Sequence, residues 1–157
     1  MGESMTDKGR MEDLDPEPRT EELLEELLAS EKTTQYLNSH VFSERSFSDY
    51  LSEMIESKGL KRADVFRKAD IGYTYGYQLV EGIRGNPSRD FVLRFAFGMA
   101  LNIRECDRLL QAADKSRLYP KNRRDAIIMF CLERHTTLME VNDELYARGE
   151  RTLTDED

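Results

Sequence analysis

Short amphipathic helical patterns, each opened by a residue that can cap a helix, set the strongest limit on how this chain folds. In SFSDYLSEMIESKGL, Ser46 precedes an apolar face and Asp49 follows three residues later, the spacing of an N-terminal capping pair. Gly59 ends the pattern, as glycine commonly does just beyond a helix. Similar starts recur at Ser88, Asn102 and Thr137. Because no segment shows the two-residue alternation of a half-buried strand, the sequence predicts an all-α fold.

The first 45 residues differ in character from the rest. Residues 1–20 are polar, acidic and proline-containing without an apolar period, which predicts a disordered acidic arm. Residues 21–45 are interpreted as a short amphipathic helix and a polar connector. In TEELLEELLAS, one helical face carries Leu23, Leu24, Leu27 and Leu28. A helix of this length needs something to pack on, because it is marginal when isolated in water.

Two larger segments make up the remainder of the predicted organisation. Residues 46–118 contain five helical patterns, which we expect to form one domain. Tyr119 and Pro120 then interrupt helix formation. Two further helical patterns in residues 119–153 predict a C-terminal helical hairpin packed on that domain. Residues 154–157 form an acidic tail that we expect to fray.

The C-terminal hairpin repeats part of the preceding domain at a spacing of 35 residues. The residues that recur 35 positions later are Arg89, Asp90, Phe95, Glu105, Leu110, Ala112 and Leu118. Each copy has the pattern of a helix, a turn with a capping residue, and a second helix. Two interpretations stay open: a duplicated hairpin, or two amphipathic hairpins that agree by coincidence. Two copies are fewer than the roughly three that a helical solenoid needs.

Charge is distributed unevenly along the chain, whose net charge is −8. Residues 1–45 carry 5 basic and 12 acidic side chains, residues 46–118 carry 12 and 10, and residues 119–157 carry 6 and 9. The net charges of these segments are therefore −7, +2 and −3. Only the middle segment could lie comfortably against phosphate groups.

The sequence argues against a membrane protein, a metal site and an enzyme. No run of about 18 apolar residues exists, so no contact with a membrane is expected. The only cysteines, Cys106 and Cys131, fall in apolar helical patterns and predict reduced core thiols in a cytoplasmic protein. His40 and His135 are the only histidines, and no paired zinc-ligand spacing exists, so we expect no metal and no other cofactor. We expect no enzymatic activity, because no nucleophile, base and acid occur in a recognisable arrangement.

Three tyrosines at alternate positions mark the segment YTYGYQLVEGIRGNPSRD. Tyr73, Tyr75 and Tyr77 lie on one predicted helix, where positions two apart point about 200° away from each other. The three rings therefore cannot all lie in the core, and at least one should be exposed. A tyrosine on a short helix is more often packing than a ligand contact, but an exposed aromatic ring in a polar surrounding favours an interface.

The run GLKRADVFRKADIGYTYGYQLVEGIRGNPS resembles the lambda-repressor-like helix-turn-helix family, the Cro and xenobiotic-response-element type of bacterial and phage regulators. The resemblance covers about 70 of the 157 residues. It rests on Gly-Leu before the second helix, the apolar turn residue Ile71, Leu79 in the third helix, and the loop of residues 82–88. It implies a helix-turn-helix bundle of about five helices over residues 46–118, with the C-terminal hairpin as an addition.

In that family the third helix lies in the major groove, with its N-terminal residues on base edges. The resemblance implies that the base-reading residues are Tyr73, Thr74, Tyr75, Tyr77 and Gln78, beside Gly72. Among these, Gln78 is chemically the best suited to read a base, because its amide can form two hydrogen bonds with adenine. The implied phosphate contacts are Lys61, Arg62, Arg84 and Arg89.

Four positions depart from the family pattern. Arg62 stands where the family usually has Gln, and Asp70 stands where it usually has Gly at the bend between helices. Asp tolerates a left-handed bend better than most residues do. Phe66 replaces a small residue and Gly76 replaces a β-branched one, which predicts that the large ring lies against the glycine.

Two functions of different classes follow. The first is a sequence-specific DNA-binding transcriptional regulator of bacterial or phage type, on double-stranded DNA and expected as a homodimer on two half-sites. The second is a helix-turn-helix-derived protein-interaction adaptor that no longer binds DNA, which the net charge, the acidic arm and the tyrosines favour. The C-terminal hairpin would supply a dimer surface or a protein-docking surface. The acidic arm could bind a protein partner, or it could cover the basic residues that are expected to contact phosphate.

Overall fold

The computed structural model describes residues 20–29, residue 33 and residues 46–155. Every regular element in these residues is a helix and none is a strand, which confirms the all-α prediction. The chain divides into two compact units, residues 1–44 and 45–157. Most of the predicted acidic arm (residues 1–19) and of the polar connector (residues 30–32 and 34–45) lies outside the described residues.

That helix is α2 (Thr20–Ala29), the described helix of the first unit. Its bounds confirm the short amphipathic helix expected from the leucine pattern. None of its residues is buried, and Leu24, Leu27 and Leu28 are exposed.

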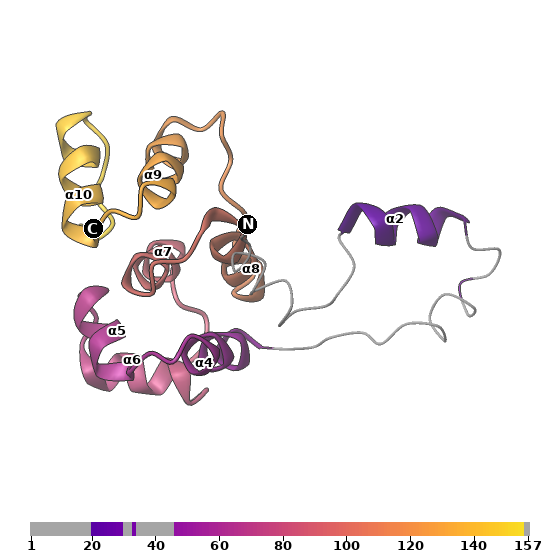
Figure 1. Cartoon of the computed structure of the whole chain (residues 1–157), viewed down its shortest axis with the longest axis horizontal. Helices are drawn as coiled ribbons and strands as arrows, with labels where there is room; N and C mark the ends of the chain where they lie inside the picture. The colour runs from indigo at the N-terminus through magenta and orange to yellow at the C-terminus, as the bar shows by residue number, and fades with distance from the viewer. Residues whose placement is uncertain (1–19, 30–32, 34–45, 156–157) are drawn as a thin grey trace, which may run out of the picture. The chain divides into compact units, whose positions relative to one another are not determined.

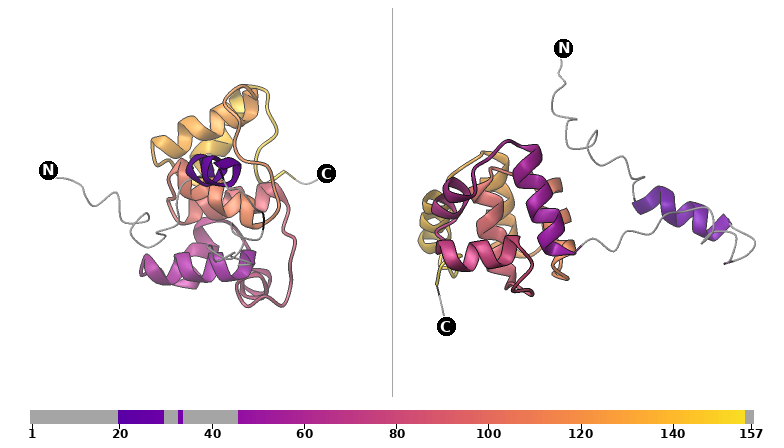
Figure 2. Two further views of the ribbon diagram at one scale, coloured as in Figure 1. Left: turned by 90° about the vertical axis from the view of Figure 1, so that its right-hand side faces the viewer. Right: turned by 90° about the horizontal axis from the view of Figure 1, so that it is seen from below.

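The second unit stacks its helices in three layers (Figure 1). Its helices are α4 (Phe47–Ser57), α5 (Arg62–Lys68), α6 (Tyr73–Val80), α7 (Arg89–Gly98), α8 (Ile103–Ala112), α9 (Arg123–Glu133) and α10 (Leu138–Ala147). The first layer contains α4, α5 and α6, the middle layer α7 and α8, and the last layer α9 and α10. The left-hand view of Figure 2 shows the same stacking from the side.

Local capping decides where these helices begin. The Ser46 hydroxyl accepts a hydrogen bond from the Asp49 N–H, as the capping pattern predicts. Ser88 caps α7 in the same way, and reciprocal capping boxes open α8 and α10. Each capping bond satisfies an amide that the helix itself leaves without a partner, which stabilises the start by about 1 kcal/mol.

One turn geometry joins the helices of three successive hairpins, α5–α6, α7–α8 and α9–α10. Asp70, Ala100 and His135 adopt φ angles of 56°, 54° and 56°. In the first turn the Ile71 N–H then donates to the Phe66 carbonyl, and the other two turns repeat this bond. The left-handed bend expected at Asp70 is therefore confirmed.

The two C-terminal hairpins share their hydrogen bonds as well as their sequence pattern. Arg89 donates to the carbonyls of residues 116 and 117, and Arg124 donates to those of residues 151 and 152, 35 positions later. Asp107 accepts from the N–H of residue 118, and Asn142 accepts from that of residue 153. This agreement favours the duplication over coincidence.

The duplicated hairpins bind each other reciprocally. Arg89 of the first copy makes two 2.9 Å hydrogen bonds to Asp125 of the second, and Arg124 of the second makes a similar pair to Asp90 of the first. In the same manner α8 packs on α9 and α10 packs on α7. Such exchange of partners is what a local two-fold axis between α7–α8 and α9–α10 produces.

The core runs through all three layers of the second unit. Phe95 of α7 is fully buried, and its ring lies edge-on to Phe47 of α4 and to Phe66 of α5, with centroids 6.3 Å apart in both cases. Cys106 and Cys131 are buried free thiols, in agreement with their predicted place in the core. Among the described residues, no helix has both the length and the apolar character needed to cross a bilayer.

Candidate nucleic-acid interface

The turn between α5 and α6 fixes α6 against the rest of the first layer. Ile71 is buried beneath the turn, while Gly72 at the start of α6 is exposed. A Cβ atom on Gly76 would lie 2.7 Å from the Phe66 ring, so α6 approaches α5 as closely as a glycine allows. This confirms the predicted exchange of volume between Phe66 and Gly76. The opposite face of α6 points to solvent.

That outer face carries two of the three tyrosines. Tyr73 and Tyr77 are 56% and 41% exposed, and their rings stack with centroids 6.4 Å apart. Tyr75 is half-buried and lies edge-on to Phe91 of α7 at 5.0 Å. The expectation that at least one ring would be exposed is confirmed. Thr74 is exposed as well, between the two stacked tyrosines in sequence.

Two arginines predicted to contact phosphate lie beside the tyrosines. The Arg62 guanidinium forms a 2.7 Å ion pair with Glu81 and lies 5.8 Å from the centre of the Tyr77 ring. Arg84 donates to the side-chain oxygen of Gln78 at 3.2 Å and lies over the Tyr75 ring at 5.5 Å. Each cation therefore already rests on an aromatic ring of α6, which holds it at the edge of the helix.

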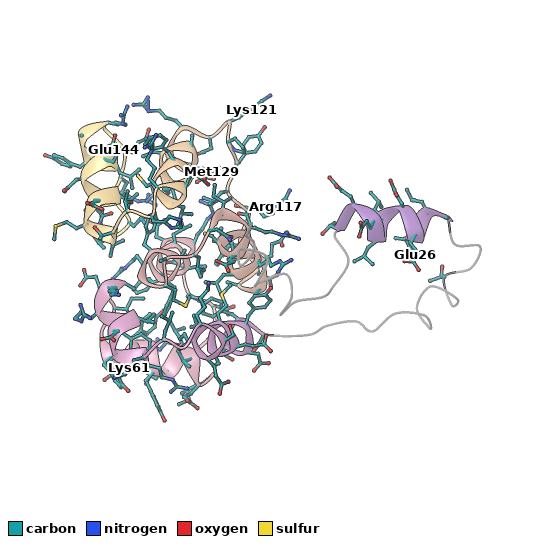
Figure 3. The ribbon with its side chains drawn as sticks, in the orientation of Figure 1. Glu26, Lys61, Arg117, Lys121, Met129 and Glu144 are labelled. Carbon is teal, nitrogen blue, oxygen red and sulfur yellow. The ribbon has the colours of Figure 1, made fainter. Side chains whose placement is uncertain are left out.

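Lys61 completes this group from the start of α5. It is exposed, and Figure 3 shows it in the first layer, at the opposite end of the stack from Glu144 of α10. The structure thus brings together eight of the nine predicted site residues. We call this surface the α6 rim: Lys61, Arg62, Tyr73, Thr74, Tyr75, Tyr77, Gln78 and Arg84.

Arg89 is the predicted residue that the structure places elsewhere. Its guanidinium binds Asp125 and two backbone carbonyls, so it is committed to the junction between α7 and α9. The hydrogen bond with Asp125 raises the pKa of Arg89, which burial partly opposes. The sequence signal for this role was the repeated Arg-Asp pair, but its crosswise pairing needs the three-dimensional fold.

A buried arginine that the sequence did not single out supports the α6 rim. Arg94 of α7 donates to the backbone carbonyls of Ala69 and Asp70, at the turn before α6. Its guanidinium stacks on Phe91 at 4.3 Å, and Phe91 in turn contacts Tyr75. We call Arg84, Tyr75, Phe91 and Arg94 the cation–aromatic column. An arginine inside the apolar run FVLRFAF was the signal that could have revealed it.

The chemistry of the α6 rim is that of a hydrogen-bonding surface with modest positive charge. It presents phenol and hydroxyl groups, one amide and three cations, while Glu81 offsets one of those cations. Within the described ranges, no cluster of three or more histidine, cysteine or acidic side chains could hold a metal ion. The side chains of the rim can donate and accept hydrogen bonds and pair with anionic groups.

None of the protein-family models, curated proteins or solved structures compared with the chain matches it significantly.

Proposed function

We propose that the protein is a sequence-specific DNA-binding transcriptional regulator of the lambda-repressor-like helix-turn-helix type. In this proposal α5 and α6 form the helix-turn-helix and α6 enters the major groove. The observation that carries it is the α6 rim itself. Exposed Tyr73, Thr74 and Tyr77 lie at the start and middle of one short helix. Lys61 and Arg62 at the start of α5 and Arg84 just beyond the end of α6 supply the basic groups of the rim.

The roles within the rim follow from the chemistry of each group. Gln78 and Arg84 are hydrogen-bonded to each other, so they would reach the groove together, the amide towards an adenine edge and the guanidinium towards the backbone. Lys61 and Arg62 would contact phosphate at the start of α5. The Arg62–Glu81 pair does not prevent this, because an ion pair this exposed contributes about 0–1 kcal/mol and a bidentate phosphate contact is stronger.

Selection of bound fragments from a random duplex pool at moderate salt tests the proposal. The parent chain is expected to enrich one sequence motif. The variant Thr74→Ala/Gln78→Ala is expected to lose or relax that motif, because it removes two polar groups from the groove-facing side without touching the core. Gln111→Ala, which removes an exposed amide from α8, is the matched control and should select the parent motif. Lack of enrichment by the parent chain would refute sequence-specific binding.

One specific observation supports the alternative function, a protein-interaction adaptor. Arg62 and Arg84 already bind partners within the protein, and Glu81 places a negative charge at the rim. A protein partner that stacks on Tyr73 and Tyr77 would use the aromatic surface and leave these bonds in place.

Salt dependence separates the two functions. Three phosphate contacts per chain predict that log affinity for DNA falls with log salt at a slope of about −2.7 per chain, and Lys61→Gln should reduce that slope by about 0.9. A tyrosine-centred protein contact should change far less with salt. Titration of a fluorescent duplex at several salt concentrations measures the slope.

A further inference from the structure

The two exposed tyrosines of the α6 rim, Tyr73 and Tyr77, are held in place from both ends. We call them the aromatic pair. The Tyr73 ring lies edge-on to the buried Phe66 ring, with centroids 5.3 Å apart. The Tyr77 ring carries the Arg62 guanidinium, which is itself bound to Glu81. The planes of the two tyrosine rings lie within 17° of each other. Because the pair is ordered in advance, it loses less side-chain freedom when it binds.

The outer face of α6 around the aromatic pair carries few polar groups that could read a base. The side-chain oxygen of Gln78 already accepts a hydrogen bond from Arg84, and Thr74 contributes one exposed hydroxyl and one methyl group. Gly72 has no side chain, and a Cβ atom there would meet no other described atom within 4 Å. A ligand can therefore come close to the start of α6, where it meets mainly the surfaces of two aromatic rings.

The chemistry of the aromatic pair limits which groups of DNA can lie against it. The apolar group that base pairs present in the major groove is the 5-methyl group of thymine. A polar base edge placed against a ring would lose its water without gaining a hydrogen bond, which is unfavourable. A methyl group would instead bury apolar surface on both sides, which is favourable. 5-Methylcytosine carries the same methyl group at the same position of the pyrimidine ring.

The spacing of the two rings suits neighbouring base pairs. Their centroids lie 6.4 Å apart, and base pairs in DNA are stacked about 3.4 Å apart. The two rings can therefore contact methyl groups no more than about two base-pair steps from each other. Gln78 fits the same site, because the adenine that its amide would read is paired with a thymine, whose methyl group lies in the same groove.

We propose that the aromatic pair of α6 recognises the 5-methyl groups of pyrimidines in the major groove. The inference rests on the proposed function, because it names the feature of DNA that the α6 rim selects. It has a consequence beyond sequence preference. 5-Methylcytosine can replace thymine at the contacted positions, so methylation of a cytosine there strengthens binding.

Base substitution in the DNA that the full chain selects from a random duplex pool provides the test. Each thymine of the enriched motif is replaced in turn by deoxyuridine, which keeps the base pairing and removes only the methyl group. Titration of fluorescent duplexes at one salt concentration should show affinity falling about fourfold for each contacted methyl that is removed. At the same positions, a 5-methylcytosine–guanine pair should bind more tightly than a cytosine–guanine pair by about the same factor.

Variants of the aromatic pair link the effect to its residues. Tyr73→Ala and Tyr77→Ala should each bind thymine and deoxyuridine equally at one of the contacted positions. Tyr146→Ala, at a 79% exposed position on α10, is the matched control and should keep the parent's preference. Circular dichroism checks that each variant keeps its helicity, and Tyr77→Ala carries the test if Tyr73→Ala loses it, since Tyr73 also contacts Phe66.

The outcomes separate this inference from the function on which it rests. A motif without thymine, a motif whose affinity is unchanged by deoxyuridine at every thymine, or tyrosine variants that keep the full preference would overturn the inference and leave the DNA-binding regulator standing. A parent chain that enriches no motif would overturn both.

Discussion

Asp107 and Asn142 occupy equivalent positions in the duplicated hairpins and accept equivalent hydrogen bonds, although only Asp107 can carry a charge. Each side-chain oxygen accepts a hydrogen bond from a backbone N–H, that of Leu118 or Leu153. Burial raises the pKa of Asp107 from its ordinary value of 3.8, and the Leu118 N–H and nearby arginines only partly offset this effect. The second copy thus shows that a neutral amide is sufficient at this site.

Asp107→Asn is therefore expected to raise stability at neutral pH. Because the pKa of Asp107 is higher in the folded than in the unfolded protein, its ionisation destabilises the fold as pH rises from the unfolded-state pKa to the folded-state pKa. The stability gained by the Asn variant should be complete above the folded-state pKa. It should vanish as pH falls to about 3.8 and below. Asp107→Ala should instead cost about 1–3 kcal/mol, because it leaves the Leu118 N–H without its acceptor. Urea unfolding between pH 3.5 and 8 measures both variants; an Asn variant that is less stable at pH 7 would contradict this account.

Cys106 illustrates how burial suppresses reactivity at a single residue. Desolvation raises its pKa to about 12, and its thiol is completely buried. At pH 8 the folded protein should therefore react with iodoacetamide at Cys106 only as fast as the protein opens. Mass spectrometry of alkylated peptides, with a sample in denaturant as the reference, measures the rate. Rapid native alkylation at Cys106 would show that α8 is far less protected than its packing indicates.

At the scale of elements, the contact of α5 with α6 sets the position of the α6 rim. Gly76→Ala should destabilise the protein by about 1–3 kcal/mol, because the new Cβ would lie 2.7 Å from the Phe66 ring. This cost opposes the gain of about 1 kcal/mol in helix propensity on replacing glycine. Phe66→Leu/Gly76→Ala should lose less stability than the sum of its single variants, which a double-mutant cycle in urea measures. Strict additivity would mean that the two side chains do not share one space.

The elements themselves were largely predictable, because their signals are local. Ser46, Asn102 and Thr137 lie within three residues of the amides that they cap, and the pairing of Phe66 with Gly76 lies within one hairpin. The pairing of Arg89 with Asp125 was not predictable, because the two residues lie 36 positions apart in the sequence. For Arg94 the sequence offers only its place inside the apolar run FVLRFAF, which marks a buried cation. Its acceptors are the backbone carbonyls of Ala69 and Asp70, and backbone carbonyls carry no sequence signal.

At the scale of the whole unit, the crosswise ion pairs connect the last layer to the middle one. Asp125→Ala should destabilise the protein by about 3–5 kcal/mol, because Asp125 is buried and its loss leaves Arg89 without its carboxylate. Glu144→Ala breaks the exposed pair with Arg148 and should cost no more than about 1 kcal/mol.

Unfolding of these variants, followed by circular dichroism and by tyrosine fluorescence, checks this prediction. Both signals should change together, because α7 and α9 share their ion pairs and the last layer cannot detach alone. Separate transitions would indicate that residues 119–153 fold independently of residues 46–118. The structure places both segments in one compact unit. It also ties the start of the predicted tail to that unit, since Thr154 accepts a hydrogen bond from Asn142.

The reciprocal pairing of Arg89 with Asp125 and of Arg124 with Asp90 has a consequence for the origin of the fold. An isologous interface uses the same patch twice, with each residue meeting the other's counterpart. A lone hairpin carrying one Arg-Asp pair already contains both halves of this contact, so two separate copies could have bound each other through it. Joining them in one chain would convert such a homodimer interface into an internal one. Each copy could then accept substitutions on its outer face independently of the other copy.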